Sequence, residues 1–136
     1  MELQDSYPLI TTSRLSEVRD FYTHWFAFEV GFESRWFLLL TSPGERPFSL
    51  AFMTPDHPSR PPGPELFSGT GMVVTFQVAN VAAEHARLVE DGLTMHYALH
   101  DEAWGQRRCM VRDPAGVLID IVEQIAPTPG YWEQYC

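Results

Sequence analysis

Asp120 is the one charged residue within an otherwise apolar run, Val117–Val122, near the end of the chain. A carboxylate inside a strand needs a cation, a hydrogen-bond donor or water, because burial of an unpaired charge is very costly. Two partners are open: Arg108, on the strand expected beside it, or a cationic ligand. Asp120 is therefore the first candidate for a functional position.

The segment Trp104-Gly105-Gln106-Arg107-Arg108 carries groups suited to noncovalent recognition. Gly105 permits a sharp turn beside the flat indole of Trp104, and Gln106 and Arg108 fall on one face of the strand that follows. Stacking on Trp104 would contribute about 0.5–1.5 kcal/mol beyond the burial of area. The segment predicts one edge of a ligand pocket, and the alternative is that Trp104 closes the end of a core.

Apolar periodicity predicts an α+β chain in which one order of elements, βαβββ, occurs twice. In the first half we expect strands at 7–12, 28–33, 36–41 and 48–53, and a helix capped by Ser13 or Ser16. In the second half we expect strands at 72–78, 94–100, 106–112 and 117–123, and a helix from Asn80 to Asp91-Gly92. An offset of 66 residues aligns the two apolar patterns.

We expect a single domain over residues 1–136 that consists of two modules, 7–53 and 72–124. Residues 54–71 contain five prolines and form a semi-rigid connector, because neither a helix nor a central strand tolerates that density. The C-terminal tail, 125–136, is rich in aromatic residues. It could pack on this domain or on a second subunit.

Composition excludes several classes of partner. The formal net charge is −9 and every basic residue is arginine, so the surface repels nucleic acid and anionic lipid. The acidity would suit cationic ligands, but it is also an ordinary aid to solubility. No apolar run reaches the roughly 18–20 residues of a membrane span. Two cysteines make no disulfide framework, so we expect a cytoplasmic protein with neither nucleic acid nor membrane as a partner.

Two short motifs lie at matching places in this repeat: Phe21-Tyr22 late in the first helix, and Asp113-Pro114-Ala115-Gly116 before the last strand. With them, residues 7–124 resemble the vicinal oxygen chelate superfamily of glyoxalase I, extradiol dioxygenases and fosfomycin- and bleomycin-resistance proteins. The resemblance implies two βαβββ modules that form curved mixed sheets. Ala27 stands where members usually have glycine.

In metal enzymes of that superfamily, the resemblance implies a His or Glu on the first strand of each half and a carboxylate on the last. Those positions fall here at Tyr7, Ala51, Val73 and Asp120. One carboxylate without an imidazole does not hold a catalytic metal, so we predict no metal, no cofactor and no catalytic residue. The alternative is a lyase or dioxygenase with a shifted site, built from Asp120, Tyr7 and a histidine from elsewhere.

The WGQR motif is similar to that of metal-free antibiotic-binding members of the bleomycin- and mitomycin-resistance type. In the mitomycin-binding kind its tryptophan stacks on the drug, which maps to Trp104 here, and those proteins are dimers with ligand grooves between subunits. We therefore expect a homodimer that sequesters an aromatic or cationic small molecule, or a biosynthetic accessory protein that binds a pathway intermediate. The predicted ligand-binding residues are Trp104, Gln106, Arg108, Trp36, Tyr7, Phe32, Met53 and Asp120. We assign Tyr22, Trp25 and Phe28 to the core.

Overall fold

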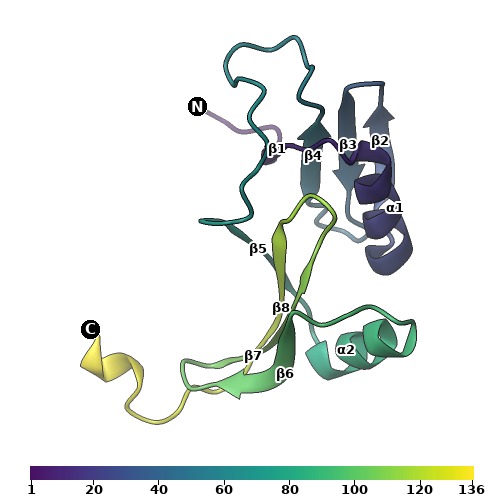
Figure 1. The fold of residues 1–136 in the computed structure, drawn as a ribbon. Coiled ribbons are helices and arrows are strands. Elements are labelled where there is room, and N and C mark those ends of the chain that lie inside the picture. The colour runs from purple at the N-terminus through teal and green to yellow at the C-terminus, as the bar shows by residue number, and fades with distance from the viewer. The chain divides into compact units, whose positions relative to one another are not determined.

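The computed structural model describes residues 1–136, and the chain divides into two compact units (Figure 1). Unit 1 comprises Met1–Thr70 and the turn Pro114–Gly116. Unit 2 comprises Gly71–Asp113 and Val117–Cys136. Each unit contains one four-stranded mixed sheet and one α-helix, as the α+β prediction of two βαβββ modules requires.

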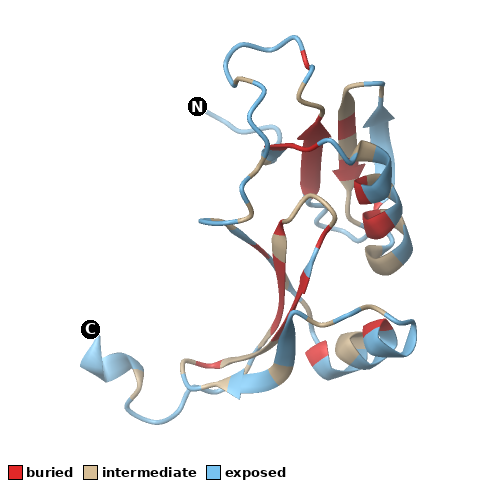
Figure 2. Cartoon of the chain, viewed as in Figure 1, coloured by how far each residue is buried: buried red, intermediate tan, exposed pale blue.

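In unit 1 the strands follow the order β1-β4-β3-β2. Their bounds are β1 Leu9–Thr11, β2 Glu29–Glu33, β3 Phe37–Thr41 and β4 Ser49–Met53. Strand β1 is parallel to β4, and the other pairs are antiparallel. Helix α1, Leu15–Phe26, packs on β2 and β3 and buries Val18, Phe21 and Tyr22 against them (Figure 2).

The core of unit 1 is aromatic at its centre. The fully buried ring of Tyr22 lies 5.4 Å from Phe28 and 5.8 Å from Phe52, measured between ring centroids. Trp25 was predicted to belong to this core, and that prediction is wrong. Its side chain is only half-buried and lines a surface hollow with Glu17 and Asp20, because its position on α1 lies beside the face that meets the sheet.

Both ends of α1 differ from simple expectation. The N-cap is Arg14 without a side-chain hydrogen bond, so neither Ser13 nor Ser16 caps the helix. Instead, the Thr12 hydroxyl accepts a hydrogen bond from the Arg14 backbone N–H at 3.1 Å. At the C-terminus Ala27 takes the left-handed conformation with φ 56°, which explains why glycine is usual at this place.

Unit 2 repeats the topology with the order β5-β8-β7-β6. Its strands are β5 Val73–Gln77, β6 Tyr97–Glu102, β7 Gln106–Arg112 and β8 Leu118–Gln124. Helix α2, Val81–Glu90, contacts β7 and β8, and the Asn80 side chain caps it by accepting a hydrogen bond from the Ala83 N–H. The structure thus confirms the predicted cap of this helix.

Strand β6 was predicted over 94–100, and its observed position is shifted toward the C-terminus. It begins at Tyr97 and continues to Glu102, because pairing with β7 extends to Glu102 opposite Gln106. A bulge lies between Tyr97 and His100. His96 therefore lies before the strand, whereas His100 lies within it.

Alternation along the strands of unit 2 separates two faces. The face toward α2 buries Cys109, Val111, Ile119 and Ile121. The opposite face, which we call the open face of unit 2, carries Arg108 and Met110 on β7 and Asp120 on β8, together with the β5 residues on the same side of the sheet. On β5 these residues, Val73, Thr75 and Gln77, are exposed (Figure 2).

The connector 54–71 is held in part by a buried histidine. The Nδ1 of His57 accepts a hydrogen bond from the Ser59 backbone N–H at 3.2 Å. Its Nε2 then donates to the Gly63 carbonyl at 2.9 Å. His57 is 1% exposed with both ring nitrogens satisfied, so its role is structural.

No helix in the structure has both the length and the apolar character needed to span a lipid bilayer.

Candidate functional site

Arg108 and Asp120 form an ion pair on the open face of unit 2. Arg108 lies on β7 opposite Val122, and Asp120 lies two residues before Val122 on β8, opposite Met110. The guanidinium Nη1 is 3.3 Å from the Asp120 Oδ2. The two side chains are only 18% and 8% exposed, so each neutralises a charge that could not otherwise stay buried. This contact confirms the first of the two partners that the sequence left open for Asp120.

Glu102 brings a second carboxylate to Arg108 from β6. Its Oε1 lies 3.6 Å from the Arg108 Nε. The same oxygen accepts a hydrogen bond from the Tyr97 hydroxyl at 3.1 Å and also contacts His100. The Nδ1 of His100 donates to the Ala98 carbonyl at 2.7 Å, which fixes the ring and directs its Nε2 to Tyr97, 2.6 Å away.

Two aromatic rings lie against the guanidinium of Arg108. Its Cζ is 5.3 Å from the Tyr97 ring centroid and 5.0 Å from that of Trp104. Both distances are within the range of cation–π attraction. Tyr97 is partly exposed and Trp104 is half-buried. The open face therefore combines flat apolar surfaces with a network of charges.

The turn between β6 and β7 positions Trp104. Its indole Nε1 donates to the Gln106 Oε1 at 2.8 Å, which fixes the orientation of the ring. Gly105 has φ +107°, and a Cβ there would approach the Ile125 carbonyl oxygen to 2.9 Å. Only glycine allows both this conformation and this approach. The backbone therefore requires the glycine that the sequence places beside the indole.

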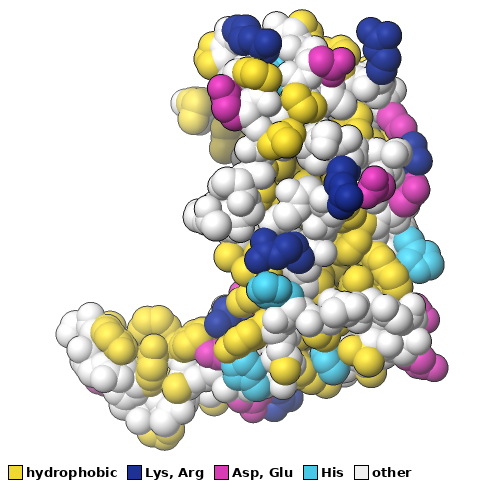
Figure 3. All heavy atoms as spheres, in the orientation of Figure 1, with side chains coloured by type: hydrophobic (Ala, Val, Ile, Leu, Met, Phe, Trp, Pro, Cys, Tyr) yellow, Lys and Arg dark blue, Asp and Glu magenta, His cyan; other side chains and the backbone are white.

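The C-terminal tail packs on this turn. The Trp132 indole donates to the Trp104 carbonyl at 2.9 Å, and the Thr128 N–H donates to the Ala103 carbonyl at 2.8 Å. The Tyr131 ring is 6.4 Å from the Trp104 ring. The structure thus places the aromatic tail against unit 2, where Trp132 and Tyr135 stay 49% and 66% exposed (Figure 3).

Two polar atoms in the ion pair have no hydrogen-bond partner although they are buried. They are the Arg108 Nε and the Asp120 Oδ1. Burial raises the pKa of Asp120, and attraction by Arg108 offsets only part of that rise. Unpaired buried polar atoms are rare, and both of these belong to the one ion pair between β7 and β8.

The thiol of Cys109 is not available to the open face as a nucleophile. Cys109 neighbours Arg108 in sequence but points to the opposite face of β7, where it is fully buried. Burial raises the pKa of its thiol to about 11, and the nearby charge of Asp120 adds to the rise. A thiol with such a pKa is inert near neutral pH.

The residues at the expected metal-ligand positions do not fit a metal. In the structure Leu9 pairs with Ala51 as Thr75 pairs with Asp120, so Ala51 and Asp120 hold equivalent places in the two sheets. Ala51, the residues of β1 that pair with β4 and the residues of β5 that pair with β8 carry neither an imidazole nor a carboxylate. No three His, Cys, Asp or Glu side chains come together in a group that could hold an ion.

The eight predicted ligand-binding residues divide between the units. Trp104, Gln106, Arg108 and Asp120 come together on the open face of unit 2. Tyr7, Phe32, Trp36 and Met53 belong to unit 1. Tyr7 precedes β1 and is 46% exposed, Phe32 is 56% exposed, Trp36 is half-buried and Met53 is 1% exposed. A binding role for these four stays a prediction.

Sequence reasoning missed Tyr97, Glu102 and His100. Because β6 was placed too early, Glu102 was read as part of a loop, and the bulge that brings Tyr97 and His100 together has no sequence signature. The sequence nevertheless contains a signal that could have placed Glu102. Gly105 marks the end of the turn, and strand pairing counted back from Gln106 places Glu102 on the same face as Arg108.

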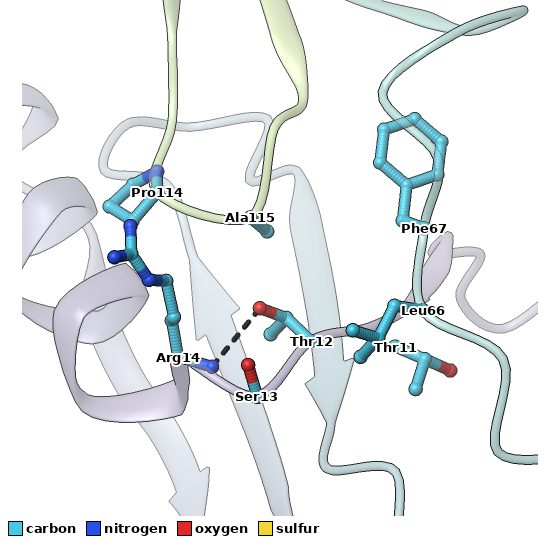
Figure 4. A pocket seen from close by; sticks show the side chains of 8 residues that line it. All are labelled: Thr11, Thr12, Ser13, Arg14, Leu66, Phe67, Pro114 and Ala115. Atoms are coloured by element: carbon cyan, nitrogen blue, oxygen red, sulfur yellow. Dashed lines mark hydrogen bonds between the residues drawn. The ribbon is translucent and has the colours of Figure 1, made fainter.

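Unit 1 contains a separate pocket of about 190 Å³ beside the start of α1 (Figure 4). Thr11, Thr12 and Ser13 contribute hydroxyl groups to its wall, and the Asp-Pro-Ala-Gly turn contributes Pro114 and Ala115. The Thr12 hydroxyl is already engaged by the Arg14 N–H. The pocket lacks a buried charge of the kind found on the open face of unit 2.

A family model matches residues 6–121, and its description is the glyoxalase/bleomycin resistance protein/dioxygenase superfamily. No curated protein matches the chain.

Solved structures that resemble the chain have the same fold at low sequence identity. A glyoxalase/bleomycin resistance protein/dioxygenase from Nocardioides superposes with a TM-score of 0.73 at 17% identity, over 92% of this chain and 85% of that one. TnmS3, an antibiotic binding protein from Streptomyces sp. CB03234, has a TM-score of 0.68 at 22% identity, over 90% and 97%. Lactoylglutathione lyase from Agrobacterium tumefaciens has a TM-score of 0.69 at 18% identity, over 90% and 95%.

Proposed function

Because the chain belongs to the glyoxalase/bleomycin resistance protein/dioxygenase superfamily, we propose that it is a metal-free protein that binds a small molecule. The ligand is planar or cationic, and sequestration of an antibiotic of the bleomycin or mitomycin kind is the leading role. The superfamily fold serves enzymes and binding proteins alike, so the function has to be inferred from the residues of the site.

The cluster around Arg108 is the observation that supports this proposal most. Trp104 is held by Gln106 and offers a flat apolar surface, while Asp120 and Glu102 supply negative charge beside it. A ligand ring would stack on the indole, and a basic group would be attracted by the carboxylates and by the net charge of −9. Binding of this kind is stoichiometric and needs no covalent step.

The structural likeness to TnmS3, an antibiotic binding protein, is compatible with this role and shows a shared fold. The likeness to a lactoylglutathione lyase shows the same fold again. The donor set separates the two possibilities, because this chain has no imidazole or second carboxylate at the equivalents of Asp120. Metal analysis of the dialysed protein tests whether the protein is metal-free. Stoichiometric Zn, Ni, Mn or Fe would contradict the proposal.

Tryptophan fluorescence tests the role of Trp104 in binding. Titration with mitomycin C, bleomycin and a hydroxyanthraquinone should quench the emission of the wild-type protein in a saturable manner for at least one compound. Trp104→Ala should lose that saturable quenching, weakening binding at least about tenfold, because stacking and the neighbouring charge act together.

Trp25→Phe provides the matched control, because Trp25 is a half-buried tryptophan of unit 1 with no place in the cluster. It should keep the saturable quenching, and the thermal stability of Trp104→Ala should stay near that of the wild type. Unfolding of Trp104→Ala would assign Trp104 to the core and contradict the pocket.

Members of the superfamily often form dimers, and we propose that this chain is a homodimer with ligand grooves at the subunit interface. Exposed apolar side chains support self-association: Leu9, Phe32 and Val73 are 44%, 56% and 47% exposed. Sedimentation equilibrium should give twice the 15.5 kDa chain mass, and a monomer at micromolar concentration would contradict the dimer.

A further inference from the structure

We propose that the C-terminal tail positions Trp104 for ligand binding, and that Trp132 is the side chain on which this positioning depends. Trp132 acts through Trp104 rather than by contact with the ligand, so it is a positioning residue. This inference rests on the proposed function and adds the tail to the elements that determine ligand affinity at the same site.

All three residues of the turn between β6 and β7 have a carbonyl group that accepts a hydrogen bond from the tail. The bonds join the Thr128 N–H to Ala103 at 2.8 Å, the Trp132 indole Nε1–H to Trp104 at 2.9 Å and the Ile125 N–H to Gly105 at 2.9 Å. Two of these donors are backbone groups, and the third is a side chain. The conformation of the turn is therefore coupled to the tail at each of its residues.

The tail also packs closely on the turn. A Cβ on Gly105 would meet the Pro127 Cδ at 3.3 Å, in addition to the Ile125 carbonyl oxygen at 2.9 Å. The Tyr131 ring is 6.4 Å from the Trp104 ring and is tilted by 49° to it. The tail therefore restrains both the backbone that carries the indole and the indole itself.

Little burial holds the tail in place. The short 3₁₀ helix Trp132–Gln134 contains no buried residue, and the rings of Tyr131, Trp132 and Tyr135 pack on one another. A segment with few buried contacts separates from the rest of a protein at a low cost in free energy. Loss of one hydrogen bond to the turn should therefore release the tail in a measurable fraction of molecules.

Release of the tail should weaken binding without any change in the groups that touch the ligand. A ligand that stacks on a fixed indole loses less free energy to ordering of the protein than a ligand that must first order it. Gln106 holds the indole Nε1 of Trp104, whereas the tail holds the backbone beneath it. Both restraints are needed for a preformed stacking surface.

Trp132→Phe removes the hydrogen bond to the Trp104 carbonyl and keeps an aromatic ring. Phenylalanine has no N–H, so it cannot donate to that carbonyl. The ring remains available to pack on Tyr131 and Tyr135, as the indole does. The thermal midpoint of unfolding should stay near that of the wild type, because Trp132 is half-exposed.

Backbone and indole ¹⁵N relaxation measures the positioning directly, without a ligand. In the wild-type protein, the order parameters of the Trp104 amide and indole should be near about 0.85, as in rigid structure. In Trp132→Phe they should fall toward about 0.6, the upper limit of flexible segments. A purely structural role of Trp132 would lower the thermal midpoint and leave these order parameters unchanged.

Titration with mitoxantrone, a planar and cationic hydroxyanthraquinone, measures the consequence for binding. The visible absorbance of mitoxantrone reports binding, so the loss of one indole does not alter the readout. Trp132→Phe should bind mitoxantrone at least about fivefold more weakly than the wild type, because loss of one hydrogen bond shifts the docking of the tail by roughly that factor.

Trp25→Phe is the matched control, because it makes the same substitution at a half-buried tryptophan of unit 1. It should keep the order parameters of Trp104 and the affinity for mitoxantrone. Equal affinity of Trp132→Phe and the wild type, or an unchanged order parameter of Trp104, would overturn the inference and leave the proposed function standing. Unfolding of Trp132→Phe would make Trp132 a core residue and would also overturn it.

The wild-type protein itself distinguishes failure of the proposed function. If mitoxantrone does not bind, the same comparison of variants is made with mitomycin C or bleomycin, whichever quenches the wild-type fluorescence. If none of the three compounds binds the wild-type protein, the proposed function and the positioning role of Trp132 are both contradicted.

Discussion

The guanidinium of Arg108 contacts groups from β6, from β8 and from the turn before β7. These contacts stabilise a positive charge on the face of a sheet. Asp120 neutralises the charge, Glu102 adds electrostatic attraction, and the rings of Tyr97 and Trp104 lie against the guanidinium. The result is a charged group that is held firmly but keeps one N–H unused.

At the scale of the residue, the sequence predicted Trp104, Gln106, Arg108 and Asp120 because a carboxylate in an apolar run and an indole beside glycine are local anomalies. Tyr97 and Glu102 carried no such signal. They reach Arg108 through strand pairing and a bulge, which are properties of two strands together. Side-chain type alone cannot predict them.

The two cysteines should differ sharply in reactivity. Cys109 is fully buried and its thiol has a pKa of about 11, whereas Cys136 is exposed. The thiolate is the reactive species, so a raised pKa and burial both slow attack. At pH 8 a chromogenic disulfide reagent should react quickly with one thiol per chain and with the second only in denaturant.

Cys136→Ser is the control for this assay and should leave no rapidly reacting thiol. Two rapid equivalents in the folded wild-type protein would contradict the burial of Cys109 and reopen the question of a nucleophile beside the site.

At the scale of the element, the strand β7 was predicted with its observed bounds because its alternation is regular and Gly105 marks its start. The bounds of β6 were wrong by two or three residues at each end, since its limits depend on what it pairs with. The cap of α2 was predicted correctly from Asn80, while α1 begins without the side-chain cap that serine residues nearby suggested. Capping by serine depends on backbone geometry as well as residue type.

The turn that carries Trp104 should be sensitive to any side chain at position 105. Gly105→Ala should lower the free energy of unfolding by about 2 kcal/mol or more, because it combines a left-handed backbone with a clash against the Ile125 carbonyl. Urea denaturation measures the change. It should also weaken ligand binding, since the turn orients the indole.

Gly92→Ala separates the cost of the left-handed backbone from the cost of the clash with a neighbouring atom. Gly92 has φ +92° and nothing within 4 Å of an added Cβ, so it should cost about 1 kcal/mol from backbone conformation alone. Equal losses for both glycines would show that the contact with Ile125 has no effect.

At the scale of the whole molecule, repetition of βαβββ was readable from the apolar pattern because both halves bury one sheet face under a helix. The mixed character of the two sheets followed from the family resemblance rather than from the pattern. The family itself contains metal enzymes and binding proteins. The apolar and hydroxyl residues at the other expected metal-ligand positions support our proposal that this chain is a binding protein.

We propose above that a ligand binds at the open face of unit 2 without a metal. The most direct test is a ¹H–¹⁵N spectrum of the chelator-treated protein, recorded with and without a saturating amount of the compound that quenches its fluorescence, because each of the four tryptophan indoles gives its own N–H signal. We predict that the Trp104 indole and the Gln106–Arg108 amides shift while the Trp25 and Trp36 indoles stay in place. Shifts confined to Trp25 and Trp36, or shifts that appear only after a divalent metal is added, would contradict the claim.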